Sequence, residues 1–174
     1  MLLGAGGAAQ ASGDRAILVA YVSATGNTER VARQAAERLG ADLCEIVPAQ
    51  PYTAGDLDYF SGGRADREQD DPRVRPAIAG PAAPVDQYGT ILLGYPIWHG
   101  QAPRIISTFL ESYDLSGKDI IPVCTSIGSG LGSSAANLHS LAPNSRWEEG
   151  RRFGTSPSRE DVERWLGTVL PDVL

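Results

Sequence analysis

The residues best suited to chemistry form a short polar loop between an apolar segment and a helical one. This loop reads Ser23-Ala24-Thr25-Gly26-Asn27-Thr28 and offers three hydroxyls and an amide. At a helix start, unpaired N–H groups and the positive end of the helix dipole attract anions. Neither a Walker-type G-x-x-x-x-G-K-[ST] loop nor G-x-G-x-x-G is present. The loop therefore fits one terminal phosphate monoester held by neutral donors, with a ligand-free helix cap as the alternative.

A second polar loop follows the third apolar segment and reads Tyr95-Pro96-Ile97-Trp98-His99-Gly100-Gln101-Ala102-Pro103. Beyond the end of a strand, Trp98 is expected to lie exposed unless something stacks on it, and a flat heteroaromatic ring would do so. Gly100 supplies a peptide that changes orientation easily. Taken alone, Trp98 is more often a packing residue and His99 a surface imidazole, so the loop does not decide by itself.

A third loop, Thr125 to Ser133, contains three glycines within five residues, at 128, 130 and 132. Bare backbone can approach a ligand closely there, and its N–H and C=O groups could bind the hydrogen-bonding edge of a ring. The G-x-S-x-G elbow of serine hydrolases is absent, because neither Ser126 nor Ser129 is flanked by glycines two residues away on both sides. We therefore do not expect a hydrolase based on these serines.

The elements that position these loops alternate between apolar strands and amphipathic helices. This pattern predicts a three-layer α/β sandwich with a five-stranded parallel sheet and right-handed crossovers. The three loops follow strands one, three and four, and so lie at one edge of the sheet. We expect strands at 16–22, 42–47, 90–95, 119–125 and within 146–153, and helices at 28–39, 104–113, 133–141 and 158–170.

Two segments break this alternation. Residues 48–87 are rich in proline and charge, and we expect only a short helix within 52–60, started near Asp56, and irregular chain through Pro72. A segment this long is either solvated surface or a flap near a binding site. Residues 1–15 are excluded from the folded domain, 16–174, as a disordered tail or the remnant of an export signal. Cytoplasmic and exported locations both stay open.

Composition limits the class of protein. The chain has 174 residues, a net charge of −6 and a pI near 4.9, which argues against binding to nucleic-acid backbone. Its two cysteines, Cys44 and Cys124, lie in apolar runs with no zinc-ligand spacing, so neither a disulfide framework nor a structural metal organises the fold. No apolar run approaches the roughly 20 residues of a membrane span.

The first loop is similar to the phosphate-loop signature [ST]-x-T-G-x-T of the flavodoxin family, and Pro96 to Gly100 resembles that family's Pro-x-Trp loop. The resemblance covers residues 16–170 and implies non-covalent FMN, the strand order 2-1-3-4-5 known from flavodoxin, and Trp98 against the flavin ring. It also implies that a peptide near His99-Gly100 rotates to bond flavin N5. The implied cofactor-binding residues are Ser23, Ala24, Thr25, Gly26, Asn27, Thr28, Pro96, Ile97, Trp98, His99, Gly100, Thr125, Ser126, Gly128, Ser129 and Gly130.

The resemblance implies an electron-transfer protein whose partner is a redox protein or NAD(P)H, with no side-chain catalyst or metal assigned. Two alternatives stay open: an FMN-dependent NAD(P)H oxidoreductase for a quinone or other acceptor, and a binding module without cofactor. The Pro-x-Arg-x-Gly loop of related quinone reductases is absent, which favours the carrier. The second and third loops carry no acid, and the third has no Tyr. This predicts a less negative potential than that of low-potential flavodoxins.

Overall fold

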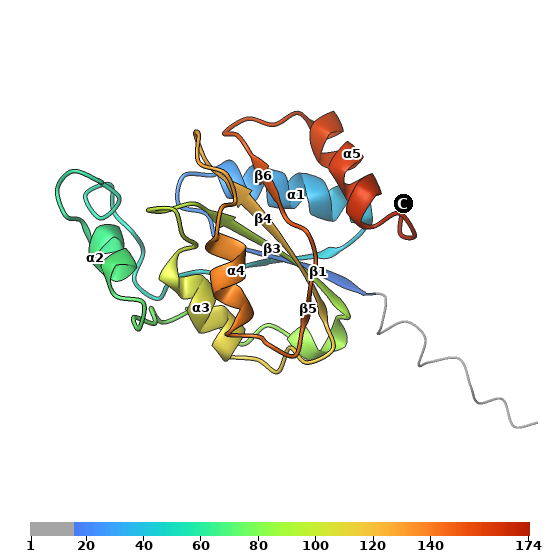
Figure 1. Ribbon diagram of the computed structural model, residues 1–174, viewed down its shortest axis with the longest axis horizontal. Helices are drawn as coiled ribbons and strands as arrows, with labels where there is room; N and C mark the ends of the chain where they lie inside the picture. The colour runs from blue at the N-terminus through green and yellow to red at the C-terminus, as the bar shows by residue number, and fades with distance from the viewer. Residues whose placement is uncertain (1–15) are drawn as a thin grey trace, which may run out of the picture.

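The computed structural model describes residues 16–174; the predicted tail at 1–15 lies outside them. A parallel sheet in the order β2-β1-β3-β4-β5, with β6 also paired to β4, lies between two layers of helices (Figure 1), which confirms the predicted fold. The elements are β1 Ile17–Tyr21, α1 Asn27–Leu39, β2 Asp42–Glu45, α2 Arg64–Asp70, the 3-10 helix η1 Val85–Gln87, β3 Thr90–Pro96, α3 Arg104–Glu111, β4 Asp119–Thr125, α4 Ser134–His139, β5 Arg146–Trp147, β6 Arg151–Phe153 and α5 Arg159–Val169.

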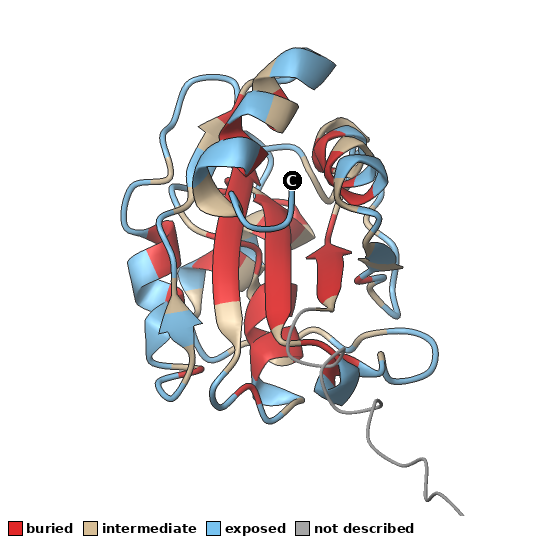
Figure 2. Cartoon of the chain, turned by 90° about the vertical axis from the view of Figure 1, so that its right-hand side faces the viewer, coloured by how far each residue is buried: buried red, intermediate tan, exposed pale blue. Residues whose placement is uncertain are grey.

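The core forms on both faces of the sheet, which explains the continuous apolar runs of the central strands. In β1, Leu18 and Ala20 pack on one face with residues of α3 and α4. Val19 and Tyr21 point to the other face and pack with residues of α1 and α5. Figure 2 shows the central strands as the buried part of the molecule, with exposed residues on the outer surfaces of the helices. The sheet is therefore a rigid platform for the loops at its edge.

The predicted last strand, within 146–153, is present as two short strands, β5 and β6. Both pair in parallel with β4, but Ile121 and Pro122 of β4, which pair with β3 on their other side, have no partner in β5 or β6. Pro122 has no N–H to donate, so the hydrogen-bonding ladder is interrupted there. Gly150 passes close by, since a Cβ at that position would lie 2.5 Å from the Pro122 carbonyl oxygen. The missing N–H of Pro122 thus explains why the predicted single strand is present as two.

The helix predicted within 52–60 is wrong, because the chain makes turns there and the helix of this segment is α2, at 64–70. The Asp56 carboxylate accepts hydrogen bonds from the N–H and hydroxyl of Thr53 at 2.8 and 2.9 Å, which closes a local turn rather than starting a helix. Helix α2 buries only Ala65 and Gln69, four residues apart. So weak an apolar face gives little hydrophobic periodicity in the sequence, so the pattern there predicts irregular structure instead of a helix.

Candidate functional site

A cavity of about 480 Å³ opens at the edge of the sheet where β1, β3 and β4 end. This volume is within the range of small-molecule sites. Every candidate residue predicted from the sequence lines it except Gly26 and Gly130. The lining consists of Ser23, Ala24, Thr25, Asn27, Thr28, Leu57, Tyr59, Ala65, Asp66, Pro96, Ile97, Trp98, His99, Gly100, Thr125, Ser126, Ile127, Gly128, Ser129 and Thr155.

One end of the cavity is the start of helix α1. Its N-cap is Gly26, in the left-handed conformation with φ 89°, and no side chain caps the helix. The Ser23 hydroxyl accepts from the Gly26 N–H at 3.1 Å and so tightens the loop. Gly26 therefore shapes the loop instead of lining the cavity. The uncapped first turn keeps its N–H groups for an anion.

A buried hydroxyl pair joins this loop to the third one. The hydroxyls of Thr28 and Thr125 lie 2.8 Å apart, and either can donate. A second contact within the first loop runs from the Asn27 amide to the Thr25 hydroxyl at 3.3 Å. Each hydroxyl accepts through two lone pairs and donates once, so these contacts leave part of the hydrogen-bonding capacity open to a ligand. The structure thus fixes the relative position of the two loops.

The second loop makes a tight two-residue hairpin between Trp98 and Gln101. Their backbone groups exchange hydrogen bonds of 2.8 and 3.0 Å. The two residues between them, His99 and Gly100, have φ of 50° and 73°, as a type I′ turn requires. Within residues 16–174, His99 is the only non-glycine residue with positive φ. The peptide picked out from the sequence therefore lies at the tip of a strained turn on the cavity wall.

The expectation that Trp98 would lie exposed without a ligand is wrong. Trp98 is 7% exposed, and the rings of Tyr52 and Trp98 pack edge to face, with centroids 5.1 Å apart at 81°. The reason is that part of residues 48–87, here called the covering segment, packs over this loop. The sequence leaves this segment open between solvated surface and a flap. Trp98 still lines the cavity, so its burial does not remove it from the candidate site.

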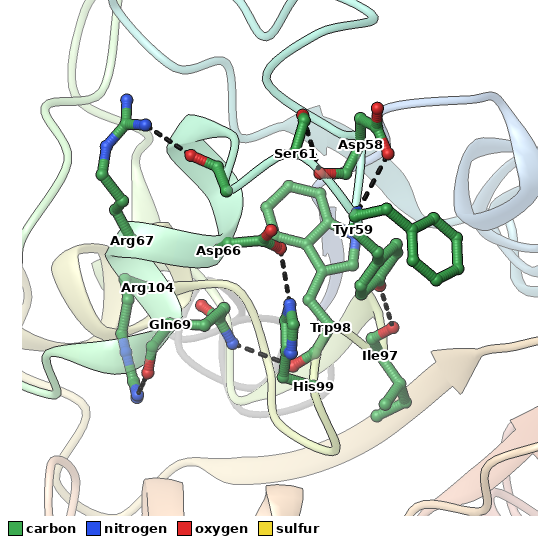
Figure 3. A network of polar contacts seen from close by, with 12 residues as sticks. Asp58, Tyr59, Ser61, Asp66, Arg67, Gln69, Ile97, Trp98, His99 and Arg104 are labelled. Carbon is green, nitrogen blue, oxygen red and sulfur yellow. Dashed lines mark hydrogen bonds and ion pairs between the residues drawn. The ribbon is translucent and has the colours of Figure 1, made fainter.

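Several hydrogen bonds hold the covering segment on the second loop (Figure 3). Gln69 of α2 donates from Nε2 to the carbonyls of Trp98 and Ala102 at 3.0 and 3.1 Å. In return, the Arg104 guanidinium donates to the carbonyl of Gln69 at 2.6 Å. Nearer the cavity, the Tyr59 hydroxyl lies 3.5 Å from the Ile97 carbonyl. Of the two interpretations of this segment, the flap beside the site agrees with these contacts.

The covering segment also brings charge into the cavity, which the sequence did not indicate. The Asp66 carboxylate lies 2.6 Å from His99 Nε2, and both residues line the cavity. Burial and the nearby charge of Asp66 raise the pKa of the Tyr59 hydroxyl, so it stays protonated. The three loops themselves carry no acid, and the carboxylate in the cavity lining comes from α2 instead. Among the described lining residues there is no Lys or Arg.

The third loop is held from outside the cavity by Arg152 of β6. Its guanidinium donates to the carbonyls of Ser126 and Ile127 at 2.9 and 2.8 Å. The Ser126 hydroxyl meanwhile donates to the Ser129 carbonyl. Three carbonyls expected to read the edge of a ring are therefore already paired. The N–H groups around Gly128 remain for binding the edge of a ring. The positive charge of Arg152 lies next to the loop, against the carbonyls of Ser126 and Ile127.

Six lining residues were missed from the sequence. Ile127 lies inside the third loop, and Thr155 follows β6, whose polar sequence gives a weak strand signal. The others come from the covering segment, and only its unusual length pointed to them. Within residues 16–174, no group of three or more His, Cys, Asp or Glu side chains could hold a metal ion. The missed residues are Leu57, Tyr59, Ala65, Asp66, Ile127 and Thr155.

Comparison with known proteins gives consistent matches. A family model described as flavodoxin matches residues 16–169. A candidate flavoprotein from Bacteroides eggerthii is 42% identical, with a TM-score of 0.82 over 88% of this chain and 97% of its own. One from Bacteroides uniformis is 41% identical, with a TM-score of 0.84 over 87% and 97%. No curated protein matches the chain.

A more distant solved structure is the flavoprotein of Lactobacillus acidophilus in complex with FMN. It is 20% identical to this chain, with a TM-score of 0.65 over 87% of this chain and 98% of its own. At that identity the likeness concerns the fold. No helix in the described part of the chain is long and apolar enough to cross a membrane. The family model spans nearly the whole described chain, so this protein belongs to the flavodoxin family.

Proposed function

We propose that this protein binds FMN non-covalently in the cavity and carries electrons between redox partners. One observation carries the proposal: the uncapped start of α1 opens into the same cavity as Trp98 and the third loop. An anion site and a ring site in one cavity suit a ligand with a phosphate at one end and a flat heterocycle at the other. The FMN complex of the Lactobacillus acidophilus flavoprotein, which shares the fold, supports this assignment.

The residues present fit such a ligand. At the phosphate end, the first-turn N–H groups of α1 are joined by the hydroxyls of Ser23 and Thr25, which also line the cavity. At the ring end, Trp98 supplies an aromatic surface, and the backbone N–H groups around Gly128 would be available to acceptors on the ring edge. FMN supplies the redox chemistry when bound, while the protein supplies binding, orientation and electrostatics.

The charges of the cavity favour a carrier over an NAD(P)H reductase. NAD(P)H carries a pyrophosphate, yet the described lining has no Lys or Arg, the start of α1 is the end we assign to the FMN phosphate, and the first turn of α2 brings the acidic Asp66 to the cavity. A reduced redox protein needs no such anion site. Ile127 and Tyr59, which are 92% and 49% exposed, give the mouth of the cavity an apolar rim suited to a protein partner.

The electrostatics also favour a potential above that of low-potential flavodoxins. Arg152 holds the third loop through two carbonyls, and its positive charge would favour negative charge on a flavin bound beside that loop. Asp66 acts in the opposite sense, but its carboxylate is paired with His99. The absence of acids in the second and third loops works in the same direction as Arg152.

Two measurements test the proposal. Purified protein reconstituted with FMN should be yellow with flavin absorption bands, and NADPH alone should not bleach it, whereas dithionite or a reduced redox protein should. Rapid bleaching by NADPH alone would favour the reductase. Failure to retain any flavin would leave the cofactor-free binding module. A second reduction step as low as that of a typical flavodoxin would contradict the expected potential.

A further inference from the structure

A buried amide joins the covering segment to the second loop. Gln69, the penultimate residue of α2, is 7% exposed, and its Nε2 donates to the carbonyls of Trp98 and Ala102. These two carbonyls lie on either side of the turn at His99 and Gly100. One amide nitrogen therefore bridges both flanks of a turn that forms part of the cavity wall (Figure 3).

The amide oxygen of Gln69 does not explain why a glutamine is buried here. Its Oε1 has no hydrogen-bond partner within residues 16–174, and a buried acceptor without a partner costs stability. Both groups that face the amide nitrogen are carbonyls, which can only accept. A methionine of similar length would fill the same space without that cost. The two N–H bonds are therefore what a glutamine adds at this position.

Arg104 completes an exchange between the two elements. It is the first residue of α3, two residues beyond Ala102, and it donates to the carbonyls of Glu68 and Gln69 at 3.2 and 2.6 Å. Carbonyls at the end of a helix lack partners within the helix, and a cation is favourable there. The covering segment thus supports the second loop through Gln69, and the residue that follows this loop fixes the end of α2 in return.

We propose that Gln69 is a positioning residue for the flavin ring, with Arg104 holding it in place. The inference rests on the proposed function. Trp98 and the turn at 99–100 line the cavity, whereas Gln69 does not line it and contacts Trp98 through its carbonyl. The two hydrogen bonds of Gln69 fix the flanks of the turn before a ligand arrives, so FMN does not have to order this wall when it binds. Gln69 therefore acts on the ring end of the site and leaves the phosphate end unchanged.

Gln69→Met tests this role because it keeps the length of the side chain and removes both donors. FMN and riboflavin share the ring and differ in the phosphate, so a change at the ring end weakens both ligands by the same factor. We expect fluorescence titrations to show each dissociation constant raised about tenfold, since two hydrogen bonds are lost. Asp70→Asn, on an exposed neighbouring residue of α2, is the matched control and should bind both ligands like wild type.

Kinetics and coupling separate positioning from stability. A residue that only stabilises the fold lowers the free energy of unfolding in urea and leaves the affinity of the folded protein unchanged. Loss of a positioning residue raises the rate of FMN release about tenfold in stopped-flow measurements, because affinity changes within one site appear mainly in the dissociation rate. Arg104→Met should have the same effect. The double variant should lose less affinity than the two single variants together, since both residues act through one exchange.

Three results would overturn the inference and leave the proposed function intact. These are unchanged FMN affinity in folded Gln69→Met, a loss that affects FMN and spares riboflavin, or faster FMN release accompanied by equally faster FMN binding. The last result would mean that the covering segment acts as a gate rather than a support. If Gln69→Met does not fold, the same titrations of Arg104→Met decide the question. Failure of the wild-type protein to bind FMN would refute both proposals.

Discussion

Gly94 in β3 lies beneath the start of α1, where the phosphate end of the cavity is built. A Cβ at this position would lie 3.1 Å from Tyr21 Cβ and 3.2 Å from Thr28 Cγ2. Non-bonded carbon atoms are roughly 3.5–4.0 Å apart at their optimal separation, so the added methyl group of Gly94→Ala overlaps its neighbours by about 0.3–0.9 Å. Both neighbours are buried, and the Tyr21 contact is to a Cβ, which cannot move without its backbone.

The magnitude follows from this geometry. Overpacking of a well-packed core costs about 1–3 kcal/mol, and we expect Gly94→Ala to lose that much free energy of unfolding. Relief of the overlap requires β3 to shift relative to both Tyr21 of β1 and Thr28 in the first turn of α1. That movement separates the Thr28 and Thr125 hydroxyls, which are 2.8 Å apart. If about 1.4 kcal/mol of the cost falls on the site, FMN affinity drops about tenfold.

Urea unfolding of the apoprotein and fluorescence titration with FMN measure the two effects. Gly167→Ala is the matched control, because Gly167 is an exposed helical residue of α5 with nothing within 4 Å of the added Cβ. Helix propensity predicts a gain of about 0.5–1 kcal/mol for that variant. If Gly94→Ala were as stable as wild type and bound FMN equally well, the close approach of β3 to α1 would be refuted.

Four further predictions concern single side chains. Trp98→Ala should lose about 3–5 kcal/mol of stability because it is buried, and should weaken FMN binding; unchanged affinity and flavin spectrum would remove Trp98 from the site. Arg152→Gln should make reduction of bound FMN less favourable by about 1 kcal/mol per electron in a potentiometric titration, whereas its exposed neighbour Arg151→Gln should not. Burial raises the pKa of Cys124 to about 12, so in native protein a thiol reagent near pH 8 should modify Cys124 far more slowly than an unfolded thiol. Arg75 donates to both carboxylate oxygens of Glu111 at 2.7 and 2.8 Å and lowers the pKa of that carboxyl. Glu111→Gln should therefore lose less than about 1 kcal/mol of unfolding free energy at neutral pH. Paired urea unfolding curves at lower pH should show this loss vanish as acid protonates the wild-type carboxylate.

The sheet and its polar edge could be predicted because their signals are local. The apolar run of β1 and the Ser23 to Thr28 loop each lie within a few consecutive residues, and parallel strands place such loops together. Long-range covering contacts leave no local signal. Asp66 is 33 residues from its partner His99, and Arg152 reaches the third loop from another strand. The burial of Trp98 was missed for the same reason, since Tyr52 lies far away in sequence.

The central claim is that FMN binds with its phosphate at the start of α1. Fluorescence titration of the apoprotein with FMN and, separately, with riboflavin tests it most directly, because riboflavin has the same ring without the phosphate. We expect an equimolar FMN complex and riboflavin binding weaker by at least about tenfold, or 1.4 kcal/mol. Equal affinity for the two ligands would contradict the phosphate site, and binding of neither would contradict the account as a whole.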